Sequence, residues 1–221
     1  MNKILLTGAT GYIGKRLLPV LLREGHHVVC CVRDKHRMVL PEGYENQLSI
    51  IEVDFLNPDT LTQIPTDIDV AYFLMHSMSS RADYESLEVK MAHNFIQVLK
   101  ATAVEQVIYL SGIINEEKLS KHLESRKRVE GILETGDFHL TTLRSGIIVG
   151  SGSASFEIIR DLVEKMFSVC DYKPDSLTLE EPPQGSVNRR CPDMSLLKSK
   201  GHYIDSVSID DGLKRTCNWY L

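Results

Sequence analysis

The residues most suggestive of chemistry stand near the start of the chain, in the stretch LLTGATGYIG. Gly8, Gly11 and Gly14 recur there at every third position, after an apolar run and before a segment of helical period. Glycines at such a turn let the backbone approach a ligand closely, and the start of a helix offers unpaired N–H groups and a positive dipole end. The turn opens a unit of about 30 residues that ends in a second apolar run. It therefore predicts dinucleotide binding rather than merely a tight turn.

Short apolar runs alternate along the chain with segments of helical period, and this alternation predicts the strands and helices that position the turn. The runs are apolar throughout, which is typical of strands buried on both faces. Strands are predicted at Lys3–Leu6, His27–Val32, Leu48–Val53, Val70–Leu74, Val107–Leu110 and Leu140–Leu143. Helices are predicted at Tyr12–Glu24, Asp83–Ala101 and Leu123–Glu134, with Gly25 and Gly136 as C-terminal stops. Right-handed crossovers between such strands predict an α/β fold with a doubly wound parallel sheet of the Rossmann type.

The composition favours one core and a small ligand. A chain of 221 residues with 43% hydrophobic residues can form one sizeable core. Its formal net charge of -5 offers no basic field for a polyanion. Nucleic acid and anionic membranes are therefore not expected as partners.

Targeting signals and metal motifs are not apparent in the sequence. No N-terminal run has the order of a signal peptide, and no apolar run reaches the roughly 18 residues that span a bilayer. A cytoplasmic location is the resulting expectation. The five cysteines include the neighbours Cys30 and Cys31, and the others lack the paired spacing of a zinc site. We expect reduced, structural thiols and no metal.

Several motifs together resemble one family. TGATGYIG is similar to the T-G-x-x-G-x-x-G fingerprint of the extended and atypical short-chain dehydrogenase/reductases, which include nucleotide-sugar epimerases and dehydratases. VDFLNPDTL, DVAYFLMHSM, VIYLSGI and TTLRSGIIVGSGSASFE match further elements in the same order. The resemblance covers about Met1 to Val169 and implies a dinucleotide-binding Rossmann domain over residues 1–169.

The resemblance also implies which residues meet the cofactor. Thr10, Tyr12 and Ile13 would accompany the three glycines at the pyrophosphate. Asp54 and Phe55 would flank the adenine. The ribose on the nicotinamide side would be lined by Leu74, Met75 and His76, and Ser111 would lie near the position of hydride transfer.

The end of the second predicted strand bears on the choice of cofactor. NAD-preferring folds place an acid there for the ribose 2′-OH, whereas a nearby arginine accommodates a 2′-phosphate. In GHHVVCCVRD, Val32 stands where the acid would be and Arg33 follows it. Lys35, His36 and Arg37 add positive charge, although such a cluster is often a solvated loop. NADP(H) is therefore expected, while Asp34 leaves NAD(H) possible.

The catalytic residues depart from the family. Members use a tyrosine and a lysine four residues later, with a serine that positions the substrate oxygen. The pattern Y-x-x-S-K-x-x-x-E falls on His122, Ser125, Arg126 and Glu130, so the usual pair is absent. Arg126 keeps a positive charge but cannot relay a proton. His122 is a candidate general acid near neutral pH, and a helix histidine without a role is the favoured alternative while no partner is visible.

Two other patterns in the sequence do not indicate a further catalytic site. Ser111 with His76 or His122 suggests a nucleophile triad, but the stretch SGI lacks the G-x-S-x-G elbow that would expose the hydroxyl, so hydrolase activity is not expected. In the helix predicted at 83–101, apolar side chains recur at helical spacing and are expected in the core: Tyr84, Leu87, Met91, Phe95 and Leu99.

The last fifty residues differ in character. DYKPDSLTLEEPPQGSVNRRCPDM is rich in proline, charge and turn residues, which is typical of a linker. PDMSLLKSKGHYIDSVSIDDGLKRTCNWYL is similar to the C-terminal segment of extended members, whose substrate region is much longer. Residues 170–221 are thus interpreted as a linker and a truncated C-terminal segment. A deletion, a fused fragment or a minimal substrate lid would each produce it.

Two classes of function remain open from the sequence. The first is an oxidoreductase or epimerase/dehydratase-type enzyme that uses NAD(P)(H) on a small carbonyl or nucleotide-linked substrate. The second is a dinucleotide-binding sensor or assembly module without turnover. The replacement of the family tyrosine and lysine by His122 and Arg126 favours the second class. The intact glycine turn favours neither, and no oligomeric state is predicted.

Overall fold

The structure is a computed structural model that describes residues 1–76, 84–114 and 119–146, together with residues 148, 150, 157, 159 and 199. The chain divides after Arg144 into two compact units, residues 1–144 and 145–221. The boundary predicted between residues 169 and 170 lies outside the described residues.

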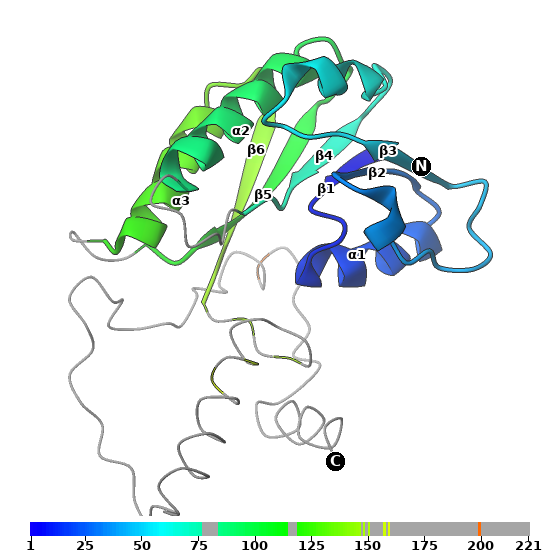
Figure 1. Ribbon diagram of the computed structural model, residues 1–221, viewed down its shortest axis with the longest axis horizontal. Coiled ribbons are helices and arrows are strands. Elements are labelled where there is room, and N and C mark those ends of the chain that lie inside the picture. The colour runs from blue at the N-terminus through cyan, green and yellow to red at the C-terminus, as the bar shows by residue number, and fades with distance from the viewer. Residues whose placement is uncertain are drawn as a thin grey trace, which may run out of the picture. The chain divides into compact units, whose positions relative to one another are not determined.

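A six-stranded sheet forms the first unit, with the order β3-β2-β1-β4-β5-β6 (Figure 1). The strands are β1 Lys3–Thr7, β2 His27–Val32, β3 Leu48–Glu52, β4 Val70–Phe73, β5 Gln106–Gly112 and β6 His139–Ser145. The four neighbouring pairs from β3 to β5 are all parallel. This order is that of a doubly wound dinucleotide-binding fold, and it confirms the predicted fold class.

The helices also follow the prediction closely. They are α1 Tyr12–Arg23, α2 Tyr84–Leu99 and α3 Lys121–Leu133, with short 3-10 helices at η1 Lys35–Arg37 and η2 Pro58–Gln63 that were not predicted. Gly25 ends α1 in the left-handed region at φ +80°, where its N–H donates to the Leu22 carbonyl and that of His26 donates to Leu21. Gly136 does not adopt a positive φ. A side chain there would collide with the Phe138 ring instead.

Two apolar clusters cover the two faces of the sheet, because successive side chains of a strand point to opposite sides. On one face, α1 packs through Leu18 and Leu22 against Ile4, Leu6 and neighbouring residues of β2. On the other face, α2 and α3 pack against alternate residues of the same strands, and Figure 1 shows α1 lying opposite these two helices. Enclosure on both sides explains why the sequences of β1 and β2 are almost wholly apolar.

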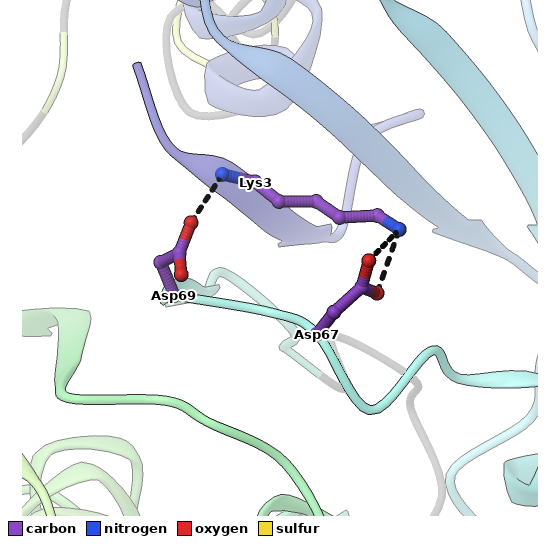
Figure 2. A network of polar contacts seen from close by, with 3 residues as sticks. All are labelled: Lys3, Asp67 and Asp69. Atoms are coloured by element: carbon purple, nitrogen blue, oxygen red, sulfur yellow. Dashed lines mark hydrogen bonds and ion pairs between the residues drawn. The ribbon is translucent and has the colours of Figure 1, made fainter.

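The amino ends of β1 and β4 are joined by polar contacts around Lys3 (Figure 2). The backbone N–H of Lys3 donates to Asp69 Oδ2 at 2.7 Å, and the Asp69 N–H donates to the Lys3 carbonyl at 2.9 Å. Lys3 Nζ contacts both carboxylate oxygens of Asp67 at 2.7 and 2.8 Å. Because the Asp67 side chain is 70% exposed, that ion pair adds little stability. The two Asp69 bonds instead help to fix the register in which Ile4 faces Val70.

Candidate functional site

Two of the three glycines in the turn after β1 are needed simply because a side chain would not fit there. Gly8 has φ +67°, and a Cβ there would lie 2.7 Å from the Leu74 carbonyl oxygen at the end of β4. A Cβ on Gly14 would collide with the Gly8 carbonyl and with Ala9. The Gly11 N–H donates to the Gly8 carbonyl at 2.9 Å and closes the turn. Gly8 and Gly14 therefore hold β1, β4 and α1 close together whether or not a ligand is bound.

Gly11 has a different environment. It is exposed, its φ of -78° suits any residue, and a Cβ there would meet only the Gly8 carbonyl oxygen, at 3.1 Å. As the N-cap residue of α1 it provides no side-chain hydrogen bond, and the first turn of α1 contains no acidic residue. By contrast, the Ser120 hydroxyl accepts from the Leu123 N–H at the start of α3. The N-terminus of α1 is thus left open to an anion.

The residues accompanying the glycines lie at the same turn. Thr10, Tyr12 and Ile13 are all partly buried. The guanidinium of Arg16 lies 3.8 Å from the centroid of the Tyr12 ring, a cation-π distance. This stacking places a positive charge on the first two turns of α1.

The carboxyl ends of β1 and β4 meet at the point where the strand order reverses. The Thr7 hydroxyl donates to the Tyr72 carbonyl at 2.8 Å and accepts from the Leu74 N–H at 3.1 Å, so it links the two strand ends. The predicted residues Leu74, Met75 and His76 follow β4 directly and are partly buried. In doubly wound sheets, ligands bind in the crevice at this switch point.

An exposed arginine follows β2, next to an aspartate that is already hydrogen-bonded to the backbone. Val32 is 4% exposed, whereas Arg33 is exposed and forms no hydrogen bond or ion pair with the described residues. Asp34 is the N-cap of η1, and its Oδ1 accepts from the His36 N–H at 2.9 Å. Glu52, which pairs with Val32 in the sheet, accepts from the Lys35 N–H at 3.0 Å. Both acids near Arg33 are therefore engaged with the backbone of η1.

The two residues predicted to flank the adenine, Asp54 and Phe55, differ in how deeply they are buried. Asp54 is partly buried, and its Oδ1 accepts from the Leu56 N–H at 3.0 Å. Phe55 is 3% exposed, and its ring packs 5.8 Å from the Phe95 ring in the core. The structure thus encloses the ring of Phe55, and Asp54 is the more accessible residue of the pair.

The catalytic candidates on α3 contact each other. Arg126 Nε donates to His122 Nε2 at 3.1 Å, so His122 has the partner that the sequence did not reveal. Burial and the Arg126 charge lower the pKa of His122, which keeps the ring neutral near pH 7. Tyr109 donates to the Arg126 carbonyl at 3.3 Å, and burial raises the pKa of Tyr109 to about 12. Ser111 follows Tyr109 by two residues in β5 and is fully buried.

A carboxylate that the sequence analysis did not single out lies among these residues. Glu88 of α2 is 2% exposed, and its Oε2 accepts from the Ser125 hydroxyl of α3. Its Oε1 lies 3.8 Å from His76 Nδ1. The available signal was its spacing, because Glu88 stands three and four residues before Met91 and Ala92 on the core-facing side of α2.

Neither a membrane-spanning helix nor a group of metal ligands is present among the described residues. None of their helices is long and apolar enough to cross a membrane. Among the same residues, no three side chains of His, Cys, Asp or Glu are grouped as ligands for a metal ion.

Solved structures with the same fold bind NAD. The enzyme WbmG of Bordetella bronchiseptica, solved in complex with NAD, superimposes with a TM-score of 0.71 at 14% identity, over 99% of this chain and 94% of WbmG. TunA, an NAD-dependent NDP-hexosamine 5,6-dehydratase of tunicamycin biosynthesis, superimposes with a TM-score of 0.66 at 14% identity, over 100% of this chain and 98% of TunA. At this identity the likeness establishes the fold.

Curated relatives include the photosystem II assembly factor Ycf39 of two algae. The protein of Cyanophora paradoxa is 30% identical over 122 residues, which are 53% of this chain and 36% of the relative. That of Guillardia theta is 27% identical over 153 residues, 66% of this chain and 47% of the relative. The chain thus spans less than half the length of these relatives.

A family model described as NAD(P)H-binding matches residues 8–162, from the first glycine of the turn onward. This range is more than half of the chain and includes the glycine turn, the switch point and α3. The chain therefore belongs to the NAD(P)H-binding family, with the fold of the NAD-dependent epimerase/dehydratase and short-chain dehydrogenase/reductase proteins.

Proposed function

We propose that this chain binds NADP(H) and catalyses an oxidoreductase or epimerase/dehydratase-type reaction on a small carbonyl or nucleotide-linked substrate. The observation that carries the proposal is the N-terminus of α1, which lacks both a side-chain cap and an acid and lies at the glycine turn of the switch point. A pyrophosphate complements such a site, because backbone N–H groups and the helix dipole both favour an anion.

The preference for NADP(H) rests on the end of β2. Arg33 is exposed and unpaired among the described residues, so its guanidinium can form two parallel bonds to a 2′-phosphate. Asp34 is the acid that would otherwise accept from a ribose hydroxyl, but its Oδ1 already accepts from the His36 N–H. Because Arg33 has no partner among the described residues and Asp34 already has one, this strand end favours NADP(H) over NAD(H).

The other predicted residues have roles consistent with this placement. The nicotinamide, when bound, supplies or accepts a hydride. Gly11 admits the pyrophosphate to the start of α1, and Asp54 borders the adenine. Leu74, Met75 and His76 line the nicotinamide side, and Ser111 lies at the end of the neighbouring strand. We assign residues 1–169 to the dinucleotide-binding domain and 170–221 to a linker and a shortened C-terminal segment.

Binding and turnover are tested together. Fluorescence titration of the purified chain with NADPH and NADH measures affinity, and NADPH oxidation is screened against a panel of small aldehydes, ketones and nucleotide-linked keto sugars. Gly11→Ala is expected to weaken NADPH binding by about tenfold or more, because the new methyl group occupies the space of the pyrophosphate. Gly131→Ala is the matched control on α3, where a Cβ meets nothing within 4 Å. Unchanged affinity in Gly11→Ala would refute the assigned pyrophosphate site.

A second candidate function is an assembly module that binds the dinucleotide without turnover. The similarity to assembly factor Ycf39 and the occurrence of His122 and Arg126 at the positions of the family tyrosine and lysine favour it. NADPH binding at micromolar concentration, with no oxidation by any member of the panel, is the result expected of such a module. Oxidation above the rate of the Gly11→Ala variant would exclude it.

A further inference from the structure

A partly buried polar cluster lies where α2, α3 and the end of β4 come together. It consists of Glu88, His76, Ser125, His122 and Arg126, and is called the Glu88 cluster below. The side chains of Glu88 and His76 are 3% and 19% exposed. The charges of Arg126, Glu88 and His76 all act on His122. The cluster therefore brings five polar side chains from three elements into one electrostatic environment.

The position of the carboxylate is not explained by packing. Its neighbours on the same side of α2 are Met91, Ala92 and Phe95, all of which belong to an apolar cluster. A carboxylate is costly to bury unless it is paired and hydrogen-bonded. The Ser125 hydroxyl supplies one hydrogen bond to Oε2. Oε1 lies opposite the imidazole of His76, 3.8 Å from Nδ1.

The two histidines of the cluster differ in whether their Nε2 atom is hydrogen-bonded. His122 Nε2 accepts from Arg126 Nε, so its lone pair is already engaged. His76 Nε2 is buried and has no hydrogen-bond partner among the described residues. A buried ring nitrogen without a partner is unfavourable, unless a ligand supplies the missing bond. His76 is thus the histidine of this cluster with a free ring nitrogen.

His76 also has the right place in the fold. It stands two residues after Leu74, whose backbone packs against Gly8 and is linked to Thr7 at the switch point. Glu88 of α2 lies opposite the ring, and His122 of α3 is close enough to interact with it electrostatically. Arg126 of α3 and Tyr109 of β5 interact in turn with Glu88. A ligand in the crevice at the carboxyl ends of β1 and β4 would lie beside this ring.

We propose that His76, held opposite the Glu88 carboxylate, is the proton-exchanging residue of this site and acts on the carbonyl oxygen of a small substrate. This inference rests on the proposed function. In reduction, Nε2 of protonated His76 would give its proton to the carbonyl oxygen, and a bound reduced nicotinamide would supply the hydride to the carbonyl carbon. The imidazole becomes neutral and is reprotonated before the next turnover. In oxidation, the same nitrogen accepts the hydroxyl proton.

The test compares wild type with His76→Asn, Glu88→Gln and the control His93→Asn, which lies on the exposed side of α2. Single-turnover oxidation of NADPH is followed across pH with a substrate from the panel above. His76→Asn is expected to lower the rate about 100-fold and to abolish its decline at high pH, as removal of a general acid does. Glu88→Gln is expected to lower the rate by less than His76→Asn does, because the amide still accepts from the Ser125 hydroxyl but no longer places a charge opposite the ring. His93→Asn is expected to match wild type.

A second readout does not depend on turnover. Calorimetric titration with NADP+ in two buffers of different ionisation enthalpy measures the protons released on binding. Wild type is expected to release protons, because the cationic nicotinamide disfavours a protonated ring beside it, and His76→Asn to release fewer. Wild-type rates and proton release in His76→Asn would overturn the role of His76 while leaving the proposed function intact. Binding without oxidation by wild type would overturn both the reductase function and this role.

Discussion

At the residue scale, the most informative neighbours are Arg33 and Asp34. The arginine is unpaired among the described residues, whereas the aspartate accepts from the His36 N–H in η1. A charged hydrogen bond of the kind that Arg33 would form with a 2′-phosphate contributes about 1.5 to 3 kcal/mol. Arg33→Ala is therefore expected to weaken NADPH binding about ten- to a hundredfold and to change NADH binding little. Isothermal calorimetry with both cofactors measures the difference.

Lys35→Ala is the control for that substitution, because it removes an exposed positive charge two residues away while the backbone N–H that donates to Glu52 remains. It is expected to weaken NADPH binding by less than threefold, since solvated charges interact only weakly. Equal losses of NADPH and NADH affinity in Arg33→Ala would show that the arginine supports the loop. A wild-type preference for NADH would show that Asp34 reaches the ribose.

His122 gives a prediction about pH and stability. Its pKa in the folded chain is lowered from the ordinary value of 6.5, first by burial and then by Arg126. Below pH 6.5 the unfolded chain therefore binds more protons at this residue than the folded chain, and acidification favours unfolding. His122→Gln keeps an acceptor for Arg126 but does not titrate. Its free energy of unfolding, measured by urea titration from pH 7.5 to 5, is expected to fall less steeply below pH 6.5 than that of wild type. An unchanged slope would contradict the lowered pKa.

The candidate site residues were predictable where a local pattern defines them. Gly8, Gly11, Gly14 and Arg33 follow from the spacing of glycines and from the residue after a strand, and the structure brings the glycines together in one turn. Glu88 was not predicted, because a charged residue on an amphipathic helix is normally assigned to solvent. Its partners Ser125 and His76 are 37 and 12 residues away in the chain, so only the packing of α2 on α3 reveals them.

At the scale of elements, alanine substitutions at two glycines with open space around them are expected to change the stability of the chain in opposite directions. A Cβ meets nothing within 4 Å at either Gly25 or Gly131, but Gly25 has φ +80° whereas Gly131 lies within α3. Gly131→Ala is expected to stabilise the chain by about 0.5 to 1 kcal/mol, since alanine loses less backbone entropy in a helix. Gly25→Ala is expected to destabilise it by roughly 1 kcal/mol, because the left-handed conformation strains a side chain. Urea unfolding measures both, and the same sign for the two variants would contradict this account.

The elements themselves were predictable in proportion to their burial. All six strands lie within a few residues of their predicted positions. Those in the middle of the sheet are enclosed between α1 on one face and α2 and α3 on the other, which gives them a strong apolar signal, whereas β3 and β6 mix apolar with polar residues. The helices η1 and η2 have no such pattern. Each depends on a single side chain, Asp34 or Asn57, that accepts from a backbone N–H two residues later. Such local bonds are common in turns and carry no periodic signal.

At the scale of the whole molecule, the candidate site depends on strands from the middle of the sheet. β1 and β4 are central in the strand order, and their carboxyl ends hold the glycine turn and His76. The two apolar clusters meet at these strands, since Ile4 and Leu6 face one cluster while Leu5, Ala71 and Phe73 face the other. A ligand at the switch point therefore binds only when the sheet and both layers of helices have formed. Cofactor binding is accordingly coupled to the folding of the described unit.

That coupling predicts a thermal shift that depends on the cofactor. A ligand that binds only the folded chain stabilises it by about 2.7 kcal/mol at a concentration 100 times its Kd. For a chain of this size, that free energy is expected to raise the Tm by roughly 5–10 °C with NADPH, as measured by differential scanning fluorimetry. At the same concentration NADH is expected to give a smaller shift, and Arg33→Ala to reduce the NADPH shift to half or less, because the 2′-phosphate contact is lost. Equal shifts for NADPH and NADH in wild type would refute the assigned preference, and no shift with either would refute binding at the switch point.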